Sequence, residues 1–137
     1  MAIIRQSRAF KDINLSFKRH PVTNDIGVLK NESAIIRSVR NLVQTIPKER
    51  FFNPLLGSDV RSTLFETSAG FVDFGTASII ERQVQTTIEN FEPRIDNLEI
   101  NVNPRPDSNE FEINVFFDII GLAFPPQEFS FILKATR

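Results

Sequence analysis

The four residues Phe91, Glu92, Pro93 and Arg94 constrain the fold most, because a helical pattern ends there and an alternating strand pattern begins shortly afterwards. Pro93 lacks a backbone N–H, and its ring disfavours the α conformation of the preceding residue, so a helix arriving from about Thr76 must end here. Glu92 then lies at the negative end of the helix dipole, where a carboxylate needs a cation, and Arg94 is the nearest one. The sequence therefore predicts a tight helix-to-strand turn with a Glu92–Arg94 ion pair, although two solvated charges would show the same spacing.

The helix that ends at this turn is the best defined of those predicted. It spans about 76–91, because its apolar residues recur at helical spacing. Ser78 and Glu81 have the spacing of a capping box, which would move the start by two residues. The predicted buried seam consists of Ile80, Val84, Ile88 and Phe91.

Two earlier helices are also predicted. One runs from an N-cap at Asn31 to about Thr45 and is ended by Pro47. A shorter one, over 59–66, would be capped by Ser58. The apolar stripe of the first consists of Ile35, Val39, Leu42, Val43 and Ile46, which recur on one helical face.

Three segments after the turn, 98–102, 111–119 and 129–135, alternate apolar and polar residues as half-buried strands do. In the middle one, Phe116 and Ile120 make both faces apolar, which predicts the central strand of an antiparallel meander. The predicted fold is therefore α+β, with two main helices and a short one packed on a three-stranded antiparallel C-terminal sheet.

The part of the chain before the first helix is predicted to be extended. Residues 1–9 show no sustained period and are interpreted as an arm. Residues 13–17 alternate, as in a half-buried strand or an ordered arm lying against the body, and 20–25 has the composition of a turn. With 137 residues and 41% hydrophobic content, the chain is predicted to form one domain, 1–137.

Composition argues against several classes of function. A net charge of −1 provides no basic surface for nucleic acid, and the absence of cysteine excludes disulfides and thiolate chemistry and fits assembly in a reducing cytoplasm. Charged residues interrupt every apolar run, so neither a signal peptide nor a membrane span is predicted. One histidine, His20, and five glycines without a phosphate-binding pattern predict no metal site and no cofactor.

One enzymatic alternative remains from the residues alone. Glycoside hydrolysis needs only two carboxylates, one of them in an apolar setting that raises its pKa, and Glu66 beside Phe65 is the candidate acid. No second carboxylate is placed by spacing, and the chain has neither Tyr nor Trp to form a sugar platform. We therefore predict that the protein is not an enzyme.

The aromatic residues favour protein interfaces instead. All 14 are Phe, which belongs in a core or a dry protein–protein contact. A three-stranded sheet also leaves two unpaired edges that a strand of another chain can join. The loop at 49–54 has two interpretations, since Phe51 and Phe52 could be buried or could form an exposed ridge. The partner-binding residues predicted on these grounds are Leu122 and Phe124, which could instead plug the core, and Phe129, Phe131 and Leu133 of the last strand.

Short motifs follow one another from residue 10 to the end of the chain. They are Phe10-Lys11-Asp12-Ile13-Asn14-Leu15-Ser16-Phe17, His20-Pro21 with Asp25-Ile26, Leu29-Lys30-Asn31-Glu32, Ser38-Val39-Arg40-Asn41-Leu42, Glu49-Arg50, Pro54 with Gly57, Leu64-Phe65-Glu66, and Glu92-Pro93-Arg94-Ile95. In this order they resemble the small baseplate wedge proteins of contractile-tailed phages and a similar subunit of the type VI secretion baseplate. Asn24 and Lys48 stand where that family often has glycine, which leaves the shape of those two turns open.

The resemblance implies a structural role. It implies a subunit of the virion tail baseplate, assembled in the host cytoplasm in multiple copies, that links larger wedge proteins to the tail sheath protein and templates the first sheath ring by strand addition. The resemblance also implies that Glu92, Pro93 and Arg94 secure the corner between helix and sheet and bind a neighbouring protein. Tube or hub proteins are further candidate partners. Two alternatives come with it: a lysozyme-like peptidoglycan hydrolase, since proteins of this family have been described as lysozyme-like, and an adaptor of a related contractile injection or type VI secretion machine.

Overall fold

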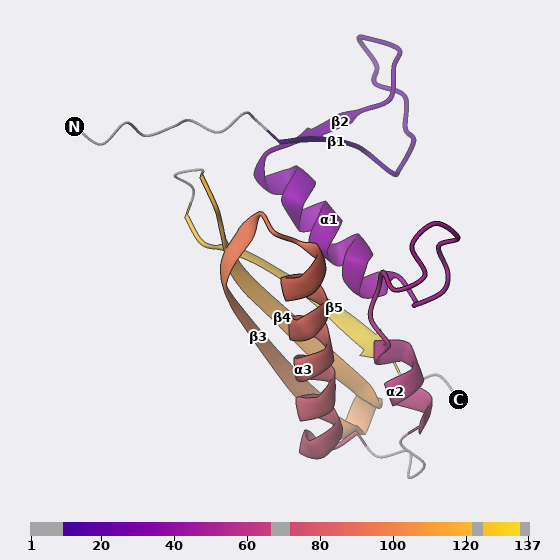
Figure 1. Cartoon of the computed structure of the whole chain (residues 1–137), viewed down its shortest axis with the longest axis vertical. Coiled ribbons are helices and arrows are strands. Elements are labelled where there is room, and N and C mark those ends of the chain that lie inside the picture. Colours follow the sequence, from indigo (N-terminus) through magenta and orange to yellow (C-terminus); the bar gives the residue numbers. More distant parts are fainter. Residues whose placement is uncertain (1–9, 67–71, 122–124, 135–137) are drawn as a thin grey trace, which may run out of the picture.

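The computed structural model describes residues 10–66, 72–121 and 125–134 (Figure 1). Within these ranges, three helices and a three-stranded antiparallel sheet follow a small two-stranded sheet, which confirms the predicted α+β fold. In chain order the elements are β1 (Lys11–Ile13), β2 (Val28–Lys30), α1 (Glu32–Gln44), α2 (Val60–Glu66), α3 (Phe74–Phe91), β3 (Ile95–Arg105), a 3₁₀ turn (Pro106–Ser108), β4 (Glu110–Ile119) and β5 (Gln127–Lys134). The predicted arm, residues 1–9, lies outside the described residues.

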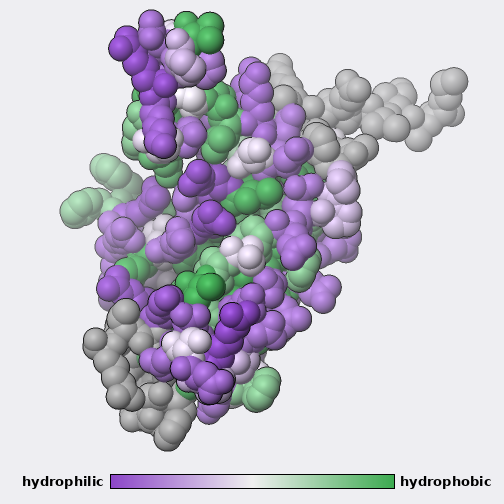
Figure 2. Space-filling model, turned by 180° about the vertical axis from the view of Figure 1, so that it is seen from behind, coloured by the Kyte–Doolittle hydropathy of each residue, from purple (hydrophilic) through white to green (hydrophobic). Residues whose placement is uncertain are grey.

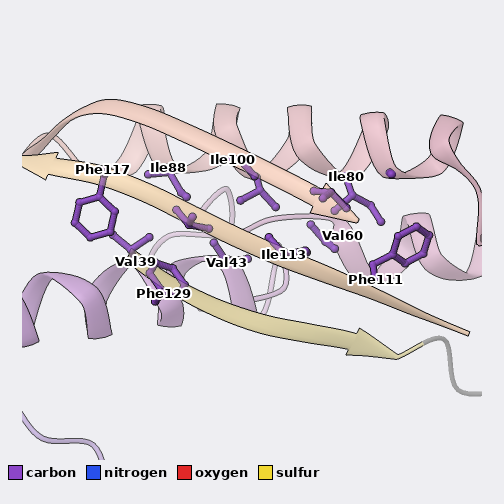
Figure 3. Packing of buried hydrophobic residues seen from close by; sticks show 14 of the residues in the cluster. Val39, Val43, Val60, Ile80, Ile88, Ile100, Phe111, Ile113, Phe117 and Phe129 are labelled. Atoms are coloured by element: carbon purple, nitrogen blue, oxygen red, sulfur yellow. The ribbon is translucent and has the colours of Figure 1, made fainter. Parts of the chain in front are cut away.

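The hydrophobic core lies between the sheet and the helices on one of its faces (Figures 1 and 3). β4 is the central strand, as predicted, and alternate residues along it are buried because successive side chains of a strand point to opposite faces. Burial of each large side chain contributes about 1.5–3 kcal/mol to stability. The buried residues that face one another are Phe111, Ile113, Val115 and Phe117 of β4, Ile80, Val84 and Ile88 of α3, and Ile35, Val39 and Val43 of α1.

The start of α3 differs from the prediction. The helix begins at Phe74, and Asp73 is its N-cap, with the carboxylate accepting the backbone N–H of Thr76 at 2.7 Å. This backbone hydrogen bond lowers the pKa of Asp73, because it favours the ionised carboxylate. Ser78, which the capping-box spacing suggested, lies in the second turn and donates its hydroxyl to the carbonyl of Phe74.

Of the two other predicted caps, Asn31 is confirmed in position but not in its side-chain hydrogen bond, and the cap by Ser58 is wrong. Asn31 occupies the N-cap position of α1, but its side chain makes no capping hydrogen bond and its buried Oδ1 has no partner among the described residues. Its backbone N–H instead donates to the carbonyl of Phe10. Ser58 donates its hydroxyl to the carbonyl of Val43 at 2.7 Å, so it ties the loop before α2 to α1.

The segment before α1 is a hairpin whose ends pair as β1 and β2. The predicted turn at 20–25 is confirmed, because His20 N–H donates to the carbonyl of Asp25 and His20 Nδ1 accepts two backbone N–H groups within the turn. The expected half-burial of 13–17 is wrong: only Ile13 belongs to a strand, and Phe17 is 65% exposed. Residues 13–17 thus alternate apolar and polar residues, but none of the described elements covers their apolar side chains.

Asn24 and Lys48 keep the backbone conformation that favours glycine. Their φ angles are 57° and 73°, both in the left-handed region. Both turns therefore have a backbone conformation that glycine adopts more readily than other residues.

The face of the sheet that is turned away from the helices is largely hydrophilic, with apolar islands (Figure 2). Phe116 is half-buried on this face, so the second apolar face predicted for the central strand is partly confirmed. Two ion pairs lie here, Arg105–Glu112 at 2.7 Å and Lys134–Glu110 at 3.0 Å. Both include exposed side chains, and such pairs contribute little to stability.

Candidate functional site

The turn after α3 holds an ion pair whose carboxylate is buried and whose guanidinium is partly exposed. Glu92 is the C-cap of α3, and the residue is only 4% exposed. Arg94 donates from Nε to Oε1 of Glu92 at 2.6 Å and from its second terminal nitrogen to Oε2 at 2.8 Å. Ser38 of α1 donates its hydroxyl to Oε2 at 2.8 Å. The predicted ion pair is confirmed. It is a bidentate pair at the corner between helix and sheet, and not a pair of solvated charges.

The electrostatics of this pair favour both charged forms. Burial of the Glu92 carboxyl is the largest effect and opposes ionisation, but the hydrogen bonds from Arg94 and Ser38 outweigh it, so the pKa of Glu92 is below its usual value. The hydrogen bond to Glu92 raises the pKa of Arg94. The pair is therefore fully charged at neutral pH.

This shift predicts a pH dependence of stability. Because the pKa of Glu92 is lower in the folded than in the unfolded chain, ionised Glu92 stabilises the fold above its unfolded pKa of about 4.3. That contribution is lost as the pH falls through the lowered folded value. We expect the difference in unfolding free energy between the protein and Glu92→Gln to shrink as the pH falls from 7 to about 3, measured by urea unfolding. A constant difference over this range would contradict the assigned pKa.

Arg94 also joins the corner to the start of the described chain. Its guanidinium lies over the ring of Phe10, 5.4 Å from the centroid, and the charge of Asp12 adds to the rise in its pKa. Its backbone carbonyl accepts the N–H of Ile120, which follows β4. The Glu92–Arg94 corner thus connects the segment before β1, α1, the end of α3, the start of β3 and the end of β4.

A groove of about 320 Å³ opens beside the corner. Its walls come from residues 12–15, α1, the loop before α2 and the end of α3, and it reaches Ser38, which donates a hydrogen bond to Glu92. Sequence patterns missed it, because its lining residues are distant in the chain and share no motif. The residues that line it include Asp12, Leu15, Asn41, Arg50, Leu56 and Phe91.

The other predicted partner-binding residues lie apart from the corner in the chain and differ in exposure. Phe129 is buried, with its ring edge-on to Phe117 at 6.3 Å between centroids, and Phe131 and Leu133 are half-buried against the core. The side chains of β5 that were assigned to partner binding are thus directed into the protein. The candidate contact for a partner is therefore the backbone edge of β5. Leu122 and Phe124 lie outside the described residues. Pro93 is exposed.

The described residues give little support to a metal site or to the hydrolase alternative. No group of three or more His, Cys, Asp or Glu residues there could hold a metal ion. Glu66, the candidate acid of the hydrolase alternative, ends α2, and its side chain is outside the described part of the structure. No described helix is both long and apolar enough to cross a bilayer.

Comparisons of the sequence with known proteins identify a family. The model of the family described as "Baseplate wedge protein gp25" matches residues 30–121. The chain is 33% identical over 89 residues to baseplate wedge protein gp25 of Enterobacteria phage T4, an alignment that covers 62% of this chain and 64% of that relative. The match therefore spans a little under two thirds of the relative's length.

Three solved structures share the fold. A putative tail lysozyme from Geobacter sulfurreducens has a TM-score of 0.66 at 20% identity, covering 77% of this chain and 92% of that one. A chain in the baseplate of the anti-feeding prophage has a TM-score of 0.60 at 16% identity, covering 94% and 88%. A chain in the baseplate complex of the type VI secretion system has a TM-score of 0.58 at 12% identity, covering 73% and 89%. At these identities the likeness concerns the fold alone.

Proposed function

Because the chain belongs to the gp25 family of baseplate wedge proteins, we propose that it is a structural subunit that joins larger wedge proteins to the tail sheath in a contractile-tail baseplate. Two of its structural neighbours come from baseplates, which supports this setting. In this proposal several copies work in each virion tail baseplate and assemble in the host cytoplasm. A contractile injection or type VI secretion machine is the alternative setting, and tube or hub proteins are further candidate partners.

The single observation that carries the proposal is the pair of unpaired strand edges. In the described part of the chain, β3 and β5 each pair only with β4, so one side of each strand has free backbone donors and acceptors. Another chain can add a strand to such an edge. About five added hydrogen bonds at roughly 1 kcal/mol each would contribute about 5 kcal/mol before any side-chain contact.

The two edges differ in quality, and β5 is the better acceptor. β3 has a register shift between Asp96 and Glu99, a left-handed Asn97, and a proline at 104 that has no N–H to donate. β5 pairs with β4 in continuous register from Gln127 to Lys134 and contains neither glycine nor proline. We therefore assign the templating edge to β5 and expect a sheath strand to join the sheet there.

The Glu92–Arg94 corner has a supporting role in this proposal. It fixes α3, which covers the inner face of the sheet, relative to β3, and through Ser38 it fixes α1 as well. Arg94 remains 30% exposed and Pro93 is exposed, so a neighbouring wedge protein can contact both. The corner would thus hold the edge strands in a fixed geometry while it contacts that neighbour.

Hydrogen exchange on mixing with purified sheath protein from the same particle tests this assignment. We expect the outward-facing amides of β5 to become at least about tenfold more protected, because they gain partners in an added strand. The amides of β3 serve as the internal control and should change little. Sheath binding without added protection in β5 would show that the sheet edge is not the contact.

A further inference from the structure

The loop after α1 carries two fully exposed phenylalanines. Phe51 and Phe52 are 98% and 104% exposed, and Leu55 is 79% exposed. The prediction that buried phenylalanines pin this loop is wrong, and the alternative, an exposed ridge, describes the structure. The loop projects beyond the C-terminal end of α1 (Figure 1). Adjoining exposed aromatic side chains of this kind typically mark an interaction site.

Backbone hydrogen bonds hold this loop in place without help from the two rings. Lys48 N–H donates to the carbonyl of Pro54 at 2.8 Å, and Leu56 N–H donates to that of Asn53 at 3.2 Å. The side chain of Glu49 accepts the N–H of Ile46 at 3.0 Å. The ridge is therefore pre-organised, and binding it costs less conformational entropy than ordering a flexible loop would.

The border of the ridge is basic. Lys48 and Arg50 precede the two phenylalanines, and neither forms an ion pair with any residue that the structure describes. Glu49, the acid between them, is engaged in the turn. A partner that buries the rings therefore gains from carboxylates placed around its cleft, which would meet the two free cations.

We propose that the ridge of Phe51 and Phe52 inserts into an apolar cleft, rimmed by carboxylates, on a neighbouring baseplate subunit. This rests on the proposed function, because it places the protein among other baseplate proteins. The contact is separate from the edge of β5 and does not use the Glu92–Arg94 corner. It gives the subunit a further attachment point.

A double variant tests how strongly incorporation into baseplates depends on this contact. We expect Phe51→Ser with Phe52→Ser to reduce incorporation into baseplates reconstituted from the particle's own proteins by at least about tenfold. The melting temperature should not change, since neither ring has an intramolecular contact to lose. Phe74→Ser is the matched control, because Phe74 is 79% exposed at the start of α3 and should be incorporated normally. Normal incorporation of the double variant would overturn the proposal.

Cross-linking identifies the protein that binds the ridge. The protein with p-benzoylphenylalanine in place of Phe52 is assembled into baseplates and irradiated, and the linked peptide is sequenced by mass spectrometry. A peptide of another baseplate subunit, with apolar residues and nearby Asp or Glu, supports the proposal; a second copy of this chain, lipid, or no cross-link overturns it.

Charge reversal tests the rim. Arg50→Glu should weaken incorporation, and the loss should be relieved at high salt, whereas an unchanged result would exclude the carboxylate rim. If even the unmodified protein fails to enter baseplates, the proposed function fails; if it enters and the double variant enters equally well, only the ridge assignment fails.

Discussion

Replacing Arg94 with alanine is expected to lower the free energy of unfolding by about 2–3 kcal/mol. The substitution leaves the buried carboxylate of Glu92 without its cation, and breaking a fully buried pair in this way costs roughly 3–5 kcal/mol. The partial exposure of Arg94 and the remaining hydrogen bond from Ser38 reduce that cost. The variant should still fold and be soluble, and urea unfolding at pH 7 measures the loss.

Arg105→Ala is the control for this prediction. Arg105 pairs with Glu112 at 2.7 Å, a similar distance, but its side chain is 51% exposed. Its loss should therefore cost no more than about 1 kcal/mol. Equal losses of unfolding free energy in the two variants would show that burial of Glu92 does not make the corner pair more stabilising than an exposed pair. We also expect Arg94→Ala, but not Arg105→Ala, to fail to attach sheath in tail reconstitution, because only Arg94 fixes the corner that positions the sheet.

Gly57→Ala should be strongly damaging for a single added methyl group, lowering stability by on the order of 3 kcal/mol. Gly57 has a φ of 124°, and an added Cβ would collide with the backbone carbonyl of Thr45, which cannot move aside as a side chain could. The same carbonyl accepts the N–H of Ser58. The new methyl would thus force apart the loop and the end of α1. Thermal and urea unfolding measure the effect.

Gly27→Ala separates this geometric effect from a general glycine effect. A Cβ at Gly27 would meet only the side chain of Asn14, at 3.8 Å, which is an ordinary contact. Its stability should change by less than about 1 kcal/mol, because no backbone clash is created. If Gly57→Ala proved equally harmless, the close approach to Thr45 would have to relax more easily than its backbone contacts indicate.

The sequence predicted those parts of the fold that local rules determine. The alternation in β4 identified it as a strand, because period two has few interpretations over ten residues, and the apolar residues on its second face indicated that it is central. Pro93 fixed the end of α3 for the same kind of reason. The ion pair was predicted from spacing alone, but its burial was not, since Ser38 and Phe10 approach the pair only after folding.

The errors arose where tertiary contacts decide what a side chain does. Asn31 and Ser58 are good capping residues, yet neither side chain makes a capping bond: Asn31 occupies the N-cap position of α1 without one, and Ser58 bonds to Val43, which a local rule cannot anticipate. For Phe51 and Phe52 the sequence left two interpretations open, burial, which is usual for apolar residues, and an exposed ridge. Their loop is held by backbone hydrogen bonds instead, so the rings stay outside.

The way the corner gathers distant segments has a consequence for biosynthesis. Phe10 and Asp12 leave the ribosome early, whereas Arg94 emerges only when most of the chain has been made. In the folded protein the guanidinium of Arg94 lies over the ring of Phe10 and interacts electrostatically with Asp12. The N-terminal hairpin can contact α1 as soon as that helix is made, but its contact with Arg94 must wait until α1, α2 and α3 have been translated. A nascent chain that stalls before residue 94 therefore lacks the contact that joins the hairpin to the corner.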